Sequence, residues 1–229
     1  MDKLPFGIYD FFAYLSSGAV LLATADYVYA LGLLNMKEVS FVLGVALLML
    51  LYVTGQVIGQ FSSLFFEQTF LGRFLGRPSA LLLGSSPRSG MVRFLFPNYH
   101  RALPANIQAR VKDQARQRNC DAEGEGLFLH AFPLVTANDK SQARLDIFLV
   151  QYGFARNMAF AFFVSALWIT IAHWYGHHPV SLRWAALAGF SAVSMFYRYL
   201  KFFRQYSYEL LIRYAELPPA SSMASSVGA

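Results

Sequence analysis

Two long stretches of this chain contain no lysine, arginine, aspartate or glutamate. Val39 to Phe66 is the first, at 28 residues, and Asn157 to Leu182 is the second, at 26 residues. A helix needs about 20 apolar residues to cross the hydrocarbon core of a bilayer, so each stretch is long enough to span. Charged residues make up only 14% of the chain, against about a quarter in a typical soluble domain. The pattern predicts an integral membrane protein.

Hydropathy predicts four transmembrane helices in an all-α bundle with cytoplasmic helical extensions. The polar turn Asn35–Glu38 is short, so we expect the first two spans to form an antiparallel αα-hairpin. The fourth span is the weakest, because its uncharged centre has only 14 residues. Arg183 and Arg198 flank this centre and can snorkel to the two interfaces. The four expected spans are Phe11–Leu34, Val39 to about Phe61, Asn157–Tyr175 and Leu182–Leu200.

The distribution of positive charge predicts the orientation. Eleven lysines and arginines lie between Ser62 and Asp146, and four more lie between Arg198 and Glu216. Each of the two short turns between spans has one, Lys37 and Arg183. Since cytoplasmic loops are rich in lysine and arginine, both termini and the long middle segment are expected in the cytoplasm.

The same charges and spans divide the chain into five segments. The middle segment carries a predicted polar helix from Pro104 to about Asn119 and a short predicted strand from Leu127 to Val135. Asn138 is placed to cap a helix that continues into the third span. The segments are the first span with its outer turn (1–38), the second span with an amphipathic extension (39–83), the basic cytoplasmic segment (84–140), the third and fourth spans with their extensions (141–217), and a disordered tail (218–229).

The second span carries the clearest packing pattern. Gly55 and Gly59 form a GxxxG motif, and Ser63 extends the row of small residues, which lets helices approach closely in lipid. A polar row, which cannot face lipid cheaply, runs along one face. This face either packs inside the bundle, contacts another subunit or lines a pore. On the fourth span, Ala185 with Gly189 and Ala188 with Ala192 form similar small-residue rows. The polar row is Tyr52, Gln56, Gln60, Ser63 and Glu67.

Ionisable residues at membrane depth are candidates for function. Near the outer ends of the spans, Asp26, His173 and Arg183 are expected at one level, with Asp26 and Arg183 as the expected pair. At the inner face, Arg156 is expected to pair with either Asp10 or Glu67. Structural ion pairs that fix helix register are the preferred interpretation over a transport role.

The sequence contains no recognisable catalytic set. Arg93 and His100 are separated by Pro97, which interrupts a helix that would align them. His177 and His178 lack a carboxylate or thiolate at the spacing of a metal site. We therefore expect no enzyme, no metal and no cofactor. Nucleic acid is an unlikely partner, because no basic patch interleaves with a known binding motif.

The expected function is that of a self-associating membrane-embedded subunit, which presents a basic cytoplasmic face to a protein partner. Such a subunit could act as an anchor, a sensor or an effector, for instance in bacterial stress or phage defence. The alternative is a small channel or transporter with a path along the polar face of the second helix. The stretches Tyr9–Phe12 and Gln151–Asn157 are similar to uncharacterised bacterial inner-membrane proteins. That similarity implies the bacterial inner membrane as the location and implies no particular activity.

Overall fold

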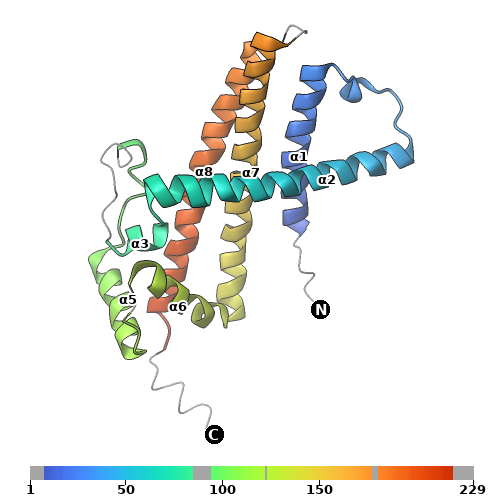
Figure 1. Ribbon diagram of the computed structural model, residues 1–229. Helices are drawn as coiled ribbons and strands as arrows, with labels where there is room; N and C mark the ends of the chain where they lie inside the picture. The colour runs from blue at the N-terminus through green and yellow to red at the C-terminus, as the bar shows by residue number, and fades with distance from the viewer. Residues whose placement is uncertain (1–7, 85–93, 122, 177–179, 219–229) are drawn as a thin grey trace. The chain divides into compact units, whose positions relative to one another are not determined.

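The computed structural model describes residues 8–84, 94–121, 123–176 and 180–218, and for residues 8–10 it describes the backbone alone. The described residues form helices and no strands, so the chain is all-α (Figure 1). Residues 85–93 of the basic segment and most of the predicted tail lie outside the described residues. The helices are α1 (Ile8–Tyr29), η1 (Leu33–Asn35), α2 (Phe41–Ser62), η2 (Ser63–Leu75), α3 (Pro78–Leu82), α5 (Ala105–Gln117), α6 (Gly124–Thr136), α7 (Asp139–Tyr175) and α8 (Leu182–Ala215).

Three of the described helices are long and apolar enough to cross a membrane, judged by length and composition. They are Phe11–Tyr29, Phe41–Leu82 and Asp139–Tyr175. The helix α8 has the predicted extent but does not reach the same hydropathy, so its role as a span stays a prediction. The predicted cap of α7 is confirmed, because Asn138 Oδ1 accepts hydrogen bonds from Lys140 N at 3.0 Å and Ser141 N at 3.4 Å.

The first helix ends earlier than predicted. The expectation that it reaches Leu34 was wrong, because α1 stops at Tyr29 and the chain turns through Ala30 (φ 51°) and Gly32 (φ 74°). The carboxylate of Asp26 then accepts hydrogen bonds from the backbone N–H of Leu33 at 2.6 Å and of Leu34 at 3.3 Å. These bonds hold the start of η1 and replace the helical bonds that the chain gives up there.

The second helix continues without a break into a π-helix. Ser40 caps its start by accepting a hydrogen bond from Leu43 N at 3.3 Å. After Ser62 the backbone follows the wider π-helical spiral of η2 as far as Leu75. The helix ends there, since Gly76 has φ 79° and Pro78 opens α3 at a position that needs no N–H donor.

The predicted strand at Leu127–Val135 was wrong, because this stretch is the helix α6. Leu127, Ala131 and Val135 are at most 3% exposed and recur every four residues, so one helical face enters a core. Pro133 is tolerated on the exposed side of the helix. A short apolar run does not by itself distinguish a strand from a buried helix.

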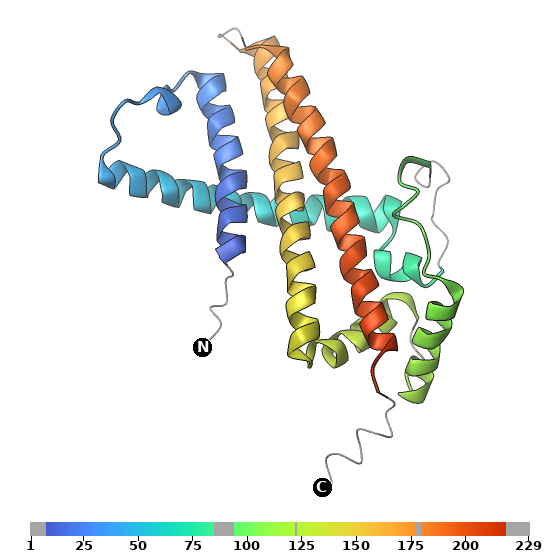
Figure 2. The same cartoon turned by 180° about the vertical axis from the view of Figure 1, so that it is seen from behind.

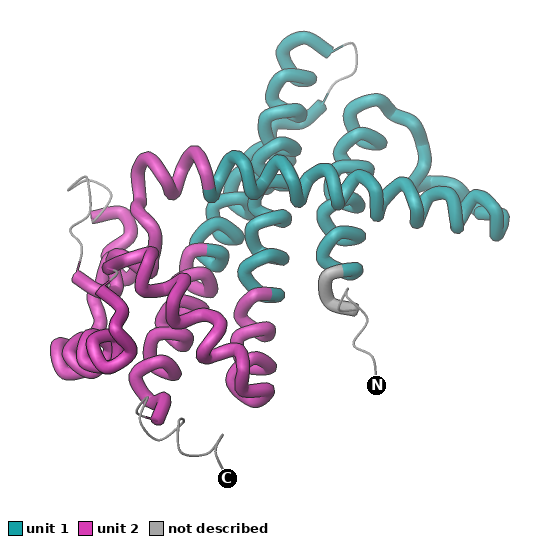
Figure 3. Tube along the Cα trace, turned by 60° about the horizontal axis from the view of Figure 1, so that its bottom comes forward, with its two compact units in different colours: residues 1–67, 150–199 teal, residues 68–149, 200–229 magenta. Residues whose placement is uncertain are grey.

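The described chain divides into two compact units (Figure 3). Unit 1 comprises residues 1–67 and 150–199, and unit 2 comprises residues 68–149 and 200–229. Unit 1 contains 5 of the 19 lysines and arginines and 5 of the 13 acidic residues, so its net charge is zero. The whole net charge of +6 therefore belongs to unit 2.

In unit 1, α1 and α7 run in the same direction and α8 runs in the opposite direction (Figures 1 and 2). Thr24 bonds Ser165, and further along both helices Val28 packs against Ile169, so α1 and α7 are parallel here. Ala185, near the start of α8, packs against the same outer level. The end of the unit that contains Val28, Ile169 and Ala185 is thus a three-helix contact.

The helix α2 lies across these three helices rather than beside α1, so the predicted antiparallel αα-hairpin was wrong (Figures 1 and 2). Its C-terminal half contacts α1, where Tyr52 meets Tyr14, and Phe66 at the start of η2 contacts Phe160 of α7 and Phe196 of α8. These contacts lie near the start of α1 and near the middle of α7 and of α8. A linker of 11 residues, 30–40, gives α2 the freedom to take this direction.

Unit 2 surrounds a core of aliphatic side chains and one tyrosine. The helices α3, α5 and α6 and the adjoining ends of α7 and α8 each contribute to it. Val111, Leu210, Leu211 and Tyr214 are completely buried. The remaining buried members of the core are Leu82, Leu103, Ala115, Leu127, Ala131, Val135 and Leu145.

Candidate functional site

The strongest polar cluster of unit 1 lies where the end of α2 meets α7. The Arg156 guanidinium pairs with the Glu67 carboxylate, and the two side chains are 14% and 30% exposed. Of the two partners that the sequence allowed for Arg156, the structure has Glu67. The other, Asp10, lies in the first turn of α1, and its side chain is outside the described residues.

Two fully buried neighbours extend this ion pair into a network. Arg156 Nε donates to Ser62 Oγ at 3.1 Å, and the Ser62 hydroxyl lies 2.8 Å from Asn157 Oδ1. Ser62 is 0% exposed and Asn157 is 3% exposed. On the other side, the Ser63 hydroxyl donates to Glu67 Oε2 at 3.2 Å. The two charges therefore neutralise each other, and their remaining donors and acceptors are used by adjacent side chains.

Glycine lets α1 and α2 touch through their backbones next to this network. A Cβ on Gly55 would overlap the carbonyl oxygen of Tyr14, and a Cβ on Gly18 would overlap that of Leu51. A Cβ on Gly59 would come within 2.9 Å of the Tyr14 ring. Both glycines of the GxxxG motif are therefore occupied by a contact within the chain.

The polar row predicted on α2 is not one continuous surface. Gln56 Nε2 donates to Tyr52 Oη at 2.9 Å, whereas Gln60 is exposed. The buried face of α2 consists of Gly55, Ile58, Gly59 and Ser62 instead. Because Gly55 and Gly59 contact α1, this face of α2 points toward α1, and Gln60 remains exposed.

The expected cluster of Asp26, His173 and Arg183 does not form, and the expected Asp26–Arg183 pair was wrong. Asp26 is 7% exposed and is occupied by the two amides of η1. His173 Nδ1 is 2.7 Å from Val180 O, and Arg183 is exposed. The amides of Leu33 and Leu34 lie close to Asp26 in the sequence. Pairing the carboxylate with them avoids the free-energy cost of removing an arginine from water.

On α8, the structure separates the two residues of the first predicted row. Ala185 is 7% exposed and packs against Val28 and Ile169. Gly189 was expected in the same contact, and this was wrong, because a Cβ there would meet no atom within 4 Å. The buried small residues after Ala185 are Ala188 and Ala192, which follow the helical period to the inward face.

Sequence reasoning missed four polar or small residues of unit 1. Ser62 was passed over for its neighbour Ser63, although it lies on the buried face of α2 with Gly55 and Gly59. Gly18 was missed because no second glycine lies four residues away to form a GxxxG motif with it. The hydroxyl oxygens of Thr24 and Ser165 lie 2.8 Å apart and form a hydrogen bond between α1 and α7. The sequence does not indicate which residue a single hydroxyl in an apolar span will contact.

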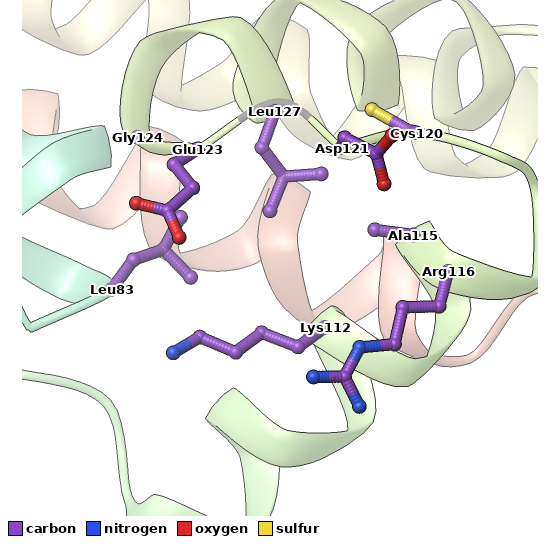
Figure 4. A pocket seen from close by; sticks show the side chains of 9 residues that line it. All are labelled: Leu83, Lys112, Ala115, Arg116, Cys120, Asp121, Glu123, Gly124 and Leu127. Carbon is purple, nitrogen blue, oxygen red and sulfur yellow. The ribbon is translucent and has the colours of Figure 1, made fainter.

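Unit 2 has a surface cavity of about 420 Å³ between α5 and the start of α6. Figure 4 shows Lys112 and Arg116 on one side of its opening, with Asp121 and Glu123 on the other. All four side chains belong to exposed residues, and no ion pair within 4.0 Å joins them across the cavity in the described chain. These charges are solvated, so the cavity adds to the polar surface of unit 2 without orienting a ligand.

Chemically, the network around Arg156 can hold helices in register. The described residues include no group of three or more histidine, cysteine, aspartate or glutamate side chains that could bind a metal ion. Comparisons with protein-family models, curated proteins and solved structures find no match.

Proposed function

We propose that this chain is a non-enzymatic membrane anchor that holds its basic unit 2 at the cytoplasmic face and presents it to an acidic protein partner. The observation that carries the proposal is the partition of charge. Unit 1 has no net charge and includes long apolar helices, whereas unit 2 has 14 lysines and arginines against 8 acidic residues. Basic segments are retained on the cytoplasmic side, and a basic surface attracts acidic partners.

The directions of the helices support two termini on one side of the membrane. Because α1 and α7 are parallel, the chain must return across the bilayer between Tyr29 and the start of α7. The helix α2 alone has 22 residues, which is about 33 Å at 1.5 Å per residue and enough to cross the hydrocarbon core. Its π-helical continuation η2 adds 13 residues, so the continuous helix can cross while tilted.

Self-association is part of the proposal, and the N-terminal half of α2 is the surface for it. Phe41, Val42 and Met49 are 86%, 77% and 63% exposed. Gly55 and Gly59 are already in contact with α1, so they are not available to a second copy.

The alternative function, a channel or transporter path along α2, has less support. A water path needs polar groups that face an open lumen. Here Ser62, Ser63 and Glu67 bond Arg156, Asn157 or each other, and Gln56 bonds Tyr52. This arrangement favours a packed anchor.

Charge reversal tests the proposal directly. In sealed inside-out vesicles, we expect the wild type to bind a cytosolic acidic protein in a salt-sensitive manner. The double variant Lys112→Glu, Arg116→Glu should lose this binding, because both side chains are exposed on unit 2. The matched control Lys37→Glu, Arg183→Glu makes the same charge change in unit 1 and should bind as the wild type does. Equal binding by all three proteins would contradict the proposal.

A further inference from the structure

Unit 1 has an apolar cavity of about 520 Å³ at the outer level, where α1, α7 and α8 meet. Thr24 and Ser165 are buried in its floor, together with Ile169 and Ala188. Tyr27 and Trp184 line it from α1 and α8 and are partly exposed, so the cavity has an open side. All of its lining belongs to unit 1.

The lining selects a neutral, apolar occupant. The described residues around the cavity include no lysine, arginine, histidine, aspartate or glutamate. An engineered cavity of about 150 Å³ lined by apolar side chains stays dry and binds benzene, and this cavity has more than three times that volume. An ion or a sugar would lose its hydration here without gaining charged partners.

The two hydroxyl groups in the floor do not change that preference. Thr24 Oγ1 donates to Val20 O at 2.8 Å, so the hydrogen between Thr24 and Ser165 comes from Ser165. Both hydroxyl hydrogens are thereby used inside the protein. The floor leaves no donor for a polar ligand group to satisfy, and its methyl and methylene groups remain as contacts.

The open side is bordered by an aromatic pair that is fixed in place. The rings of Tyr27 and Trp184 meet edge to face with centroids 6.4 Å apart. Tyr27 Oη accepts a hydrogen bond from Ser181 N at 2.8 Å, which ties α1 to the outer turn before α8. Tyrosine and tryptophan are enriched at the level of lipid headgroups, so the cavity extends from that level toward the bilayer interior.

We propose that this cavity holds one acyl chain of a membrane phospholipid, which completes the contact between α1 and α8. The inference rests on the membrane placement in the proposed function, because the bilayer supplies the chain. Hydrocarbon contact with the lining provides the affinity, and the headgroup remains outside beside Tyr27 and Trp184.

The test uses the full-length protein, delipidated in mild detergent and then exposed to dioleoylphosphatidylcholine. Native mass spectrometry counts the lipids that remain bound. We expect the wild type to retain one lipid and Ala188→Phe to retain none, because Ala188 lines the floor. The control Val193→Phe places the same side chain on the exposed side of α8, outside the cavity, and should retain the lipid. If Ala188→Phe does not fold, Ala23→Phe fills the same cavity from α1.

A second lipid separates chain recognition from headgroup recognition. Dihexanoylphosphatidylcholine has the same headgroup and short chains, and we expect it to bind at least about tenfold more weakly. Equal binding of the two lipids, or retention by both cavity-filling variants, would overturn the inference. Extraction of the wild type from membranes by alkaline carbonate reports on the anchor itself. Protein that resists extraction but retains no lipid contradicts only the acyl-chain inference, whereas extracted protein contradicts the anchor as well.

Discussion

Unit 1 and unit 2 are both built from helices, but they differ in how their polar side chains are paired and buried. In unit 1, buried polar side chains find partners on other helices, as Arg156 does with Glu67 and Thr24 does with Ser165. In unit 2, the core is aliphatic apart from Tyr214, and each ion pair has an arginine that reaches water. Arg77 and Glu125 are 55% and 46% exposed, and the buried Glu209 pairs with Arg144, which is 55% exposed. Water can supply the driving force for burying the core of unit 2. In lipid, where we propose that unit 1 lies, that force is absent, and close packing and hydrogen bonds would hold the helices together.

The largest expected effect breaks the close packing of unit 1. Gly55→Ala places a Cβ against the backbone of Tyr14, which cannot move aside as a flexible side chain can. We expect a loss of about 3 kcal/mol or more in unfolding free energy. Gly189→Ala is the matched control, since its Cβ meets no atom within 4 Å, and it should be neutral or stabilising by up to about 1 kcal/mol. Reversible unfolding in mixed micelles measures both, and equal effects would show that α1 and α2 do not touch here.

An intermediate effect compares one arginine from each unit. Arg156→Ala leaves Glu67 without its cation and removes the hydrogen bonds that Arg156 donates to Ser62 and Asn157. We expect a loss of about 2–3 kcal/mol, below the range for fully buried pairs because Glu67 is 30% exposed.

The unit 2 counterpart is Arg144→Ala. Arg144 lies 2.7 Å from Glu209, but it is 55% exposed, and Glu209 keeps its second partner Arg213 at 3.1 Å. The expected loss is below about 1 kcal/mol. A larger loss for Arg144→Ala than for Arg156→Ala would reverse the contrast between the units.

The smallest expected effect concerns Tyr214 in the core of unit 2. Its ring is 0% exposed, and its hydroxyl has no hydrogen-bond partner among the described residues. Removing an unsatisfied hydroxyl relieves a desolvation penalty. Tyr214→Phe should therefore be neutral or stabilising by less than about 1 kcal/mol near neutral pH.

The same tyrosine gives a pH dependence with a defined sign. Burial raises the pKa of the Tyr214 phenol above its ordinary value of 10.0. The unfolded chain then releases this proton at lower pH than the folded chain. The contribution of Tyr214 to the unfolding free energy is constant below about pH 10. It falls as the pH rises from there toward the pKa of the folded state. Chemical denaturation at about pH 8 and about pH 11 should show a smaller decrease for Tyr214→Phe than for the wild type. An equal decrease in stability for the variant and the wild type would show that the Tyr214 phenol is exposed to water in the folded protein.

The sequence predicted the features that depend on composition and local chemistry. The uncharged stretches became α2 and the apolar part of α7, and the Asn138 cap formed as expected. The direction of α2 could not be predicted, because hydropathy reports length and apolarity but carries no information on crossing angle. The end of α1 was missed because Asp26 was considered as a partner for an arginine rather than for backbone amides. Ser62 lies on the buried face of α2 with Gly55 and Gly59, and its bond to Arg156 joins residues 94 positions apart in the sequence, so no local pattern indicates it.

Labelling with a charged, membrane-impermeant maleimide tests the division between an embedded unit 1 and a cytoplasmic unit 2 most directly. Cys120, the one cysteine of the chain, lies in unit 2 and is partly exposed. It should react in sealed inside-out vesicles and remain unlabelled in right-side-out vesicles. Val193→Cys in a Cys120→Ser background lies on the exposed side of α8 in unit 1 and should react in neither, because lipid keeps the thiol un-ionised and the reagent out. Labelling of Cys120 from outside, or of Val193→Cys in either preparation, would contradict the account.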